Sequence, residues 1–126
     1  MLKIISFIKN VSGAAAIEFA IVFPVILLLV FGIMELGYVL WADSSMKYAA
    51  SYASRYAFVN PTASSTAIKN FALSKVDLSG SPITFTVTTN TTTVDIDGSF
   101  VHSFLVIPMS PITITTHIHQ SVPTNM

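Results

Sequence analysis

The first third of the chain is dominated by apolar side chains. From Phe19 to Met34 there is no charged residue, and extension back to Ala14 gives about 21 residues, or roughly 31 Å of helix. That length is enough to span a bilayer. A secretory signal peptide has a shorter apolar region and ends in a small-x-small cleavage site, so the pattern indicates a retained membrane segment.

Helix-forming residues continue beyond the apolar stretch. Two stripes recur along them at helical spacing, the tyrosines Tyr48, Tyr52 and Tyr56 and the alanines Ala49, Ala53 and Ala57. Proline disfavours helical geometry in the residue before it, so the Asn60-Pro61 step marks the end of the helix. The pattern predicts one long helix over residues 14–59, with only its first half in lipid.

The remainder of the chain predicts a short helix followed by strands. The helix is expected from about Thr66 to Lys75, with Ser64 or Ser65 as its N-cap. The period then changes to two: apolar side chains at 83, 85 and 87 alternate with threonines, which is typical of a half-buried strand. Positions 94 and 96 predict a second strand, with a hairpin turn at Asp97-Gly98.

Two later segments complete the predicted sheet. Residues 99–108 are apolar on both faces, which indicates a central strand, and residues 111–122 alternate again. A sheet of three or four antiparallel strands must cover its apolar face. The nearest apolar surface is the tyrosine and alanine face of the long helix. The predicted fold class is therefore α+β, with a long N-terminal transmembrane and amphipathic helix and a small antiparallel head over residues 60–126.

Charge and composition predict the orientation of the chain in the membrane and argue against nucleic acid as a partner. The 126 residues are 52% hydrophobic and 10% charged, with six basic and six acidic side chains. Lys3 and Lys9 precede the apolar stretch, which predicts a cytoplasmic N-terminus and a head outside the cytoplasm. A neutral chain without a basic cluster gives no reason to expect nucleic acid as a partner. There is no cysteine, and so no disulfide argument about compartment.

The sequence contains no recognisable catalytic motif. It lacks a cysteine nucleophile, a G-x-S-x-G elbow and a phosphate loop, so we expect no enzyme and no cofactor. His117 and His119 share one face of a predicted strand, and His102 is a possible third ligand, but exposed histidines are favoured over a metal site. The segment Asp95–Gly98 lacks the later carboxylates of a calcium loop.

Glu18 is an acid near the start of the apolar stretch. A carboxylate within a membrane helix is costly, and one interpretation is that it lies close enough to the interface to reach water. The surrounding "GAAAIEFAIVFP" resembles the N-terminal processing signature of type IV pilin-like proteins, and most closely that of the TadE-like pseudopilins of tight-adherence pili. The resemblance covers residues 13–59 and includes Pro24.

The resemblance implies a processing site and a set of partners. In this family a prepilin peptidase cuts after a glycine, which matches Gly13, and leaves a new N-terminus, which matches Ala14. Glu18 and Phe19 match the glutamate and the aromatic residue that follow, and residues 1–13 match the leader. The implied protein is a minor pseudopilin in a bacterial inner membrane, whose partners are the peptidase, other pilin subunits, the assembly platform and the lipid bilayer.

Several helix residues have expected roles, of which that of Glu18 is implied by the resemblance. Glu18 is expected to meet the N-terminal amine of an adjacent subunit, so that two groups costly in lipid neutralise each other. Pro24 is expected to bend or locally loosen the helix, either as a tolerated kink of a membrane helix or with a role in packing or extraction. The three tyrosines are expected in the core or at a subunit interface, and Glu35 at the membrane interface.

Two other functions remain open. In the first, the chain is a membrane-anchored binding module or adhesin, and its threonine-rich head contacts a glycan or a partner. In the second, it is a major filament subunit, although the major pilins of this system are typically much shorter. A simple anchor needs no glycine, glutamate and phenylalanine at fixed spacing, so the motif favours the pseudopilin.

Overall fold

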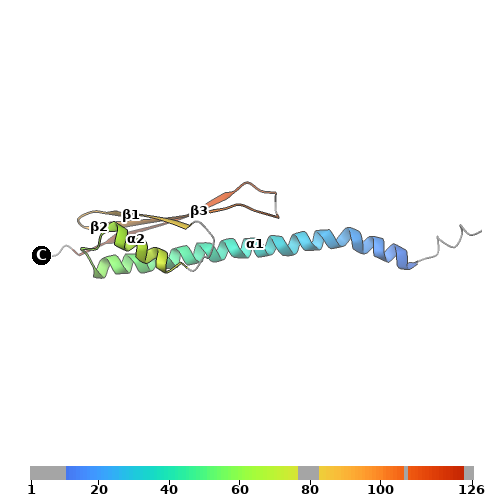
Figure 1. The fold of residues 1–126 in the computed structure, drawn as a ribbon, viewed down its shortest axis with the longest axis horizontal. Coiled ribbons are helices and arrows are strands. Elements are labelled where there is room, and N and C mark those ends of the chain that lie inside the picture. The colour runs from blue at the N-terminus through green and yellow to red at the C-terminus, as the bar shows by residue number, and fades with distance from the viewer. Residues whose placement is uncertain (1–10, 77–82, 107, 124–126) are drawn as a thin grey trace, which may run out of the picture.

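One long helix runs through most of the molecule, and the other elements pack against its second half. The computed structural model describes residues 11–76, 83–106 and 108–123. Helix α1 runs Val11–Val59 without interruption and extends far beyond the head on one side, as Figure 1 shows. Its described part includes Gly13, so the helix begins ahead of the expected cleavage point; residues 1–10 of the expected leader lie outside the described residues. This confirms the predicted long helix and its end before Asn60.

Pro24 lies inside α1. Proline has no backbone N–H, so the helix lacks one hydrogen bond there, and its ring crowds the preceding turn. The blue, N-terminal end of α1 in Figure 1 turns away from the axis of the remainder. The helix tolerates the proline without ending, in agreement with the predicted continuous helix.

Helix α2, Ser65–Ser74, packs across α1 and against the first strand. Ser64 is its N-cap: its backbone is extended and its hydroxyl accepts a hydrogen bond from the backbone N–H of Ala67 at 3.2 Å. Ile68 and Ala72 are buried on the inner side of the helix. The predicted short helix is therefore confirmed, with Ser64 rather than Ser65 as its cap.

The head contains one antiparallel sheet of order β1-β2-β3. The strands are β1, Ile83–Thr89; β2, Thr93–His102; and β3, Ile112–Ser121. Alternating burial along β1 and β2 confirms that one face is covered and the other is open to solvent. The fold class is therefore α+β, with a small three-stranded sheet lying along the second half of α1 (Figure 1).

The predicted turn at Asp97-Gly98 is wrong. Both residues lie inside β2, where Gly98 pairs with Phe85 on one side and with Thr116 on the other. The β1–β2 turn lies at residues 90–92 instead, closed by a hydrogen bond from the backbone N–H of Asn90 to the carbonyl of Thr93 at 2.8 Å. Residues 93–102 form one central strand, and the chain leaves the sheet after His102.

The core lies between the sheet and the alanine stripe of α1. Phe85 and Phe100 are the largest fully buried side chains, and burial of each contributes roughly 1.5–3 kcal/mol. They pack with Met46 and with a row of small side chains. That row consists of Ala42, Ala49, Ala50, Ala53 and Ala57, all with at most 1% of their surface exposed. Small side chains allow the sheet to approach the helix backbone closely.

The tyrosine stripe does not cover the sheet as expected. Tyr48 and Tyr52 are 53% and 40% exposed, although their ring centroids lie 4.5 Å apart. Tyr56 is half-buried and stacks on Phe71 of α2 with centroids 4.5 Å apart. The alanine half of the predicted covering face is therefore confirmed, and of the three tyrosines in the stripe Tyr56 packs against the core.

Candidate functional site

The N-terminal half of α1 has the properties of a membrane span. Among the residues that the structure describes, α1 is the one helix long and apolar enough to cross a bilayer, and 6% of its most apolar window is buried within the chain. A core helix of a soluble domain can be equally apolar but is mostly buried. Large side chains such as Ile21, Leu29 and Ile33 are more than half exposed here. This surface requires lipid or another chain to cover it.

The processing-motif residues lie together at the start of this span. Gly13, Ala14, Glu18 and Phe19 are all exposed on α1. Ala14 and Glu18 are four residues apart, so they share one face of the helix, about 6 Å apart along its axis. Phe19 stacks on Phe23 with centroids 5.1 Å apart. The arrangement leaves the carboxylate of Glu18 available to a group outside this chain.

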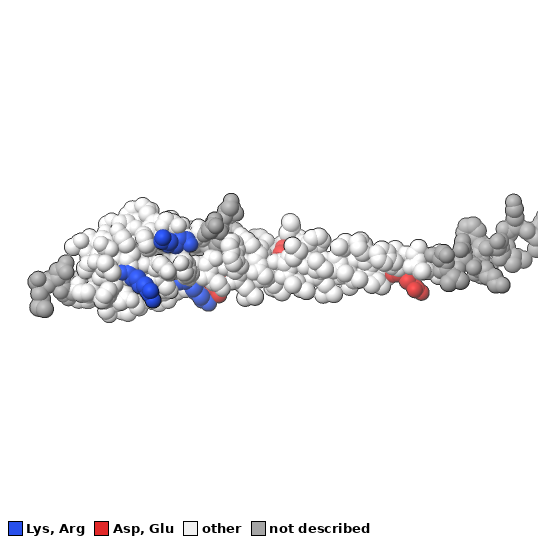
Figure 2. All heavy atoms as spheres, turned by 90° about the horizontal axis from the view of Figure 1, so that it is seen from below, with Lys and Arg blue, Asp and Glu red and all other residues white. Residues whose placement is uncertain are grey.

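Charged side chains are distributed unevenly along the molecule. Figure 2 shows the basic side chains gathered over the head, whereas the face of α1 seen beyond the head is uncharged apart from acidic atoms. In the described sequence before Asp43 the charged residues are Glu18 and Glu35. Both carboxylates therefore lie on the more apolar of the two described helices, where a charge is costly.

Glu35 has a structural role that the sequence did not indicate. Its Oε1 accepts hydrogen bonds from the backbone N–H groups of Leu105, at 2.5 Å, and Val106, at 3.3 Å. These groups lie just after β2, so one side chain connects α1 to the chain between β2 and β3. Hydrogen bonds to a charged acceptor are stronger than neutral ones. The expected position of Glu35 at the membrane interface stays a prediction, and the structure shows that its side chain holds this loop to the helix.

His102 is separated from the other two histidines. It lies at the end of β2 on the inner face of the sheet, with ring contacts to Tyr38, Phe100 and Phe104 at centroid distances of 4.9–6.1 Å. Its Nε2 is buried and makes no hydrogen bond with the described residues. The suggested grouping of His102 with His117 is therefore wrong, because the strand register places them on opposite faces.

The outer face of the sheet carries two acid–histidine pairs. His117 Nδ1 lies 2.7 Å from Asp97 Oδ1, and His119 Nδ1 lies 2.6 Å from Asp95 Oδ1. The β2–β3 register places each histidine directly opposite its aspartate. Both histidine side chains are more than half exposed. Within the described residues, no three histidine or acidic side chains are grouped so as to hold a metal ion.

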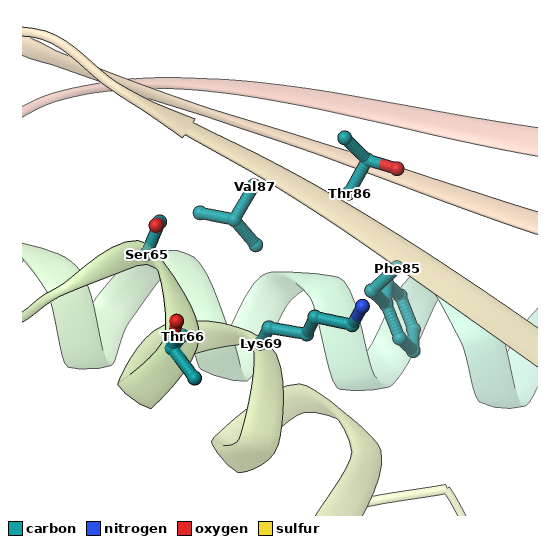
Figure 3. Close-up of a pocket in the computed structure, with 6 residues that line it drawn as sticks. All are labelled: Ser65, Thr66, Lys69, Phe85, Thr86 and Val87. Carbon is teal, nitrogen blue, oxygen red and sulfur yellow. The ribbon is translucent and has the colours of Figure 1, made fainter.

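A shallow hollow opens between α2 and β1. It has a volume of about 200 Å³ and is lined by Ser65, Thr66, Lys69, Phe85, Thr86 and Val87. Figure 3 shows the Lys69 side chain extended toward the Phe85 ring, with the hydroxyls of Ser65 and Thr86 well apart. Ligand pockets usually enclose roughly 300–1,000 Å³ with convergent polar groups. This hollow does not meet that description.

The exposed tyrosines form the remaining feature of the head. Tyr52 raises the pKa of Tyr48 above its ordinary value, chiefly through a side-chain hydrogen bond. The two rings present an exposed aromatic surface on α1.

Two features of the site could not be found by sequence reasoning. The contact between Glu35 and Leu105 joins residues 70 positions apart, and no local sequence pattern predicts it. The sequence contained a partial indication of the Asp–His pairs, because both residue types recur at a spacing of two. The pairs form only in one register of β2 and β3, and the sequence did not determine that register. Because a turn was predicted at Asp97-Gly98, the pairing of Asp95 and Asp97 with β3 was not predicted.

The comparisons with known proteins bear on the helix. A family model described as TadE-like protein matches residues 13–55. No curated protein and no solved structure gives a significant match. The matched range contains the motif residues Gly13, Ala14, Glu18 and Phe19 and most of α1, and TadE-like proteins are associated with the tight-adherence pilus. Residues 13–55 are therefore similar to TadE-like proteins, which confirms the resemblance over that range.

Proposed function

We propose that the protein is a minor pseudopilin of a tight-adherence pilus, cut after Gly13 by a prepilin peptidase and then active in pilus assembly. The observation that supports this most strongly is Glu18, an exposed carboxylate on a helix that its own chain leaves uncovered. A monomer in lipid bears the full cost of that charge. A bundle of such helices supplies a partner for it.

The partner is the new N-terminal amine of an adjacent subunit. Cleavage after Gly13 creates an ammonium group at Ala14, on the same helix face as Glu18 and about 6 Å along the axis. Within one chain the two groups lie a helical turn apart. A small axial offset between neighbouring helices brings the amine of one chain to the carboxylate of the next, which offsets the desolvation of both.

The membrane topology follows from the same elements. The N-terminus lies in the cytoplasm, α1 crosses the inner membrane, and the head lies on the outer side. The partners are the peptidase, other pilin subunits and the assembly platform.

The variant Glu18→Ala tests the pairing. We expect normal insertion into the membrane and a loss of about tenfold or more in cross-linking to neighbouring subunits. The reason is that the Ala14 ammonium group of the neighbouring subunit becomes a buried charge without a partner. Asp43→Ala is the matched control, because it removes an acid from the same helix outside the span. Normal incorporation of the Glu18 variant into assemblies would contradict the proposed pairing.

A further inference from the structure

The loop after β2 carries apolar side chains that the head does not cover. The described parts of this β2–β3 loop are residues 103–106 and 108–111. Leu105 is 92% exposed and Met109 is 56% exposed, and Val101 at the end of β2 is 47% exposed. Large apolar side chains that lie this close in sequence and are this exposed indicate a surface that meets a partner or a membrane.

The depth of the loop relative to the apolar helix is fixed by Glu35. The stretch from Ala14 to Met34 is roughly 31 Å long, which matches the hydrocarbon core of a bilayer, so Glu35 lies at the outer boundary of that core. The backbone N–H groups of Leu105 and Val106 are bonded to the Glu35 carboxylate. The loop therefore lies at the same level as the end of the span. In Figure 1 the β2–β3 end of the sheet is the end directed toward the N-terminal half of α1.

The composition of the loop suits a layer of low polarity. From Gly98 to the end of the chain there is no lysine, arginine, aspartate or glutamate. Pro108 and Pro111 have no backbone N–H that would need a partner. The N–H groups of Leu105 and Val106 are satisfied by Glu35, whose charge they stabilise in turn. Polar backbone groups near lipid require such internal partners.

We propose that the β2–β3 loop lies in the outer interface of the bilayer, with Leu105 and Met109 directed into lipid, and that Glu35 holds it there. The head is then seated on the membrane at two places, through α1 and through this loop. Its orientation relative to the bilayer is fixed as a result. This inference rests on the membrane span of α1 and is independent of the proposed pilus function.

The absence of cysteine makes a direct test possible. Leu105→Cys, labelled with an environment-sensitive fluorophore, would be studied in the full chain in vesicles of phosphatidylethanolamine and phosphatidylglycerol. Leu29→Cys in the span and Thr91→Cys in the turn at the opposite end of the sheet are the references. We expect a blue-shifted emission at 105 that is lost to nitroxide-labelled phospholipid, as at 29, and no such loss at 91.

A second label and two variants complete the experiment. Met109→Cys should behave as Leu105→Cys does. Glu35→Ala should return the label at 105 to the emission seen at 91 while the label at 29 stays quenched by lipid, and Asp43→Ala should change neither. Quenching at 105 by aqueous iodide alone would overturn the proposal. So would a blue shift that appears at high protein density without lipid quenching, because the loop would then contact a neighbouring chain.

Discussion

Gly98 on β2 and Met46 on α1 approach so closely that there is no room for a side chain between them. A Cβ atom on Gly98 would lie 2.9 Å from Met46 Cγ, and equally close to Phe85 Cε1 and Thr116 Cγ2. Glycine within a strand often marks such a close approach. The contact explains how the middle of the sheet can lie directly on the alanine stripe.

Gly98→Ala should therefore destabilise the head. Three neighbours would have to move together, and overpacking of this kind costs about 1–3 kcal/mol of unfolding free energy. Gly37→Ala is the matched control, since a Cβ there meets nothing within 4 Å and alanine favours a helix by up to about 1 kcal/mol. Chemical denaturation of the full chain in detergent measures both. Equal denaturation midpoints for the two variants would contradict the packing described.

The outer acid–histidine pairs should contribute little to stability. His117 and His119 are exposed, and ion pairs at a protein surface are typically worth about 0–1 kcal/mol. The double variant His117→Ala with His119→Ala should change the unfolding free energy by less than about 1 kcal/mol. His102→Ala should cost more, because that ring packs among Tyr38, Phe100 and Phe104. Denaturant titrations that ranked the variants in the reverse order would refute this division of roles.

The tyrosine stripe should divide into a core residue and a surface pair. Tyr56→Ala removes the stack on Phe71 and should cost about 2 kcal/mol of unfolding free energy. Tyr48→Ala removes an exposed ring and should change stability by less than about 0.5 kcal/mol. If the pair forms a subunit interface, one of the two roles expected from the sequence, Tyr48→Ala and Tyr52→Ala should lower cross-linking between subunits. Thermal unfolding and cross-linking yields separate these effects, and an unchanged yield would exclude the interface.

Local patterns predicted the helices and strands well where neighbouring residues decide the structure. The apolar stretch, the Ser64 cap and the alternation in β1 and β3 all depend on periodicity or on turn residues close in sequence. The TadE-like motif is local in the same sense, because its residues lie close together in the sequence. For this reason the long helix and the α+β class could be predicted before the structure was known.

Long-range packing decided the points that sequence reasoning missed. Asp97-Gly98 carries a strong local turn signal, but the glycine is required where β2 crosses Met46, and the strand continues through it. Tyrosine and alanine stripes lie side by side on α1, and the alanines face the sheet because small side chains permit close approach. The bond from Leu105 to Glu35 depends on where β2 ends, which no local pattern specifies.

The most direct test of the proposed function is the intact mass and N-terminal sequence of the protein recovered from membranes, with and without its prepilin peptidase. The processing motif predicts a chain that begins at Ala14 when the peptidase is present and retains residues 1–13 when it is absent. That result would support the pseudopilin route and the exposed amine that Glu18 requires. A chain that kept residues 1–13 in both samples would contradict it, and α1 would then serve as a simple membrane anchor for the head.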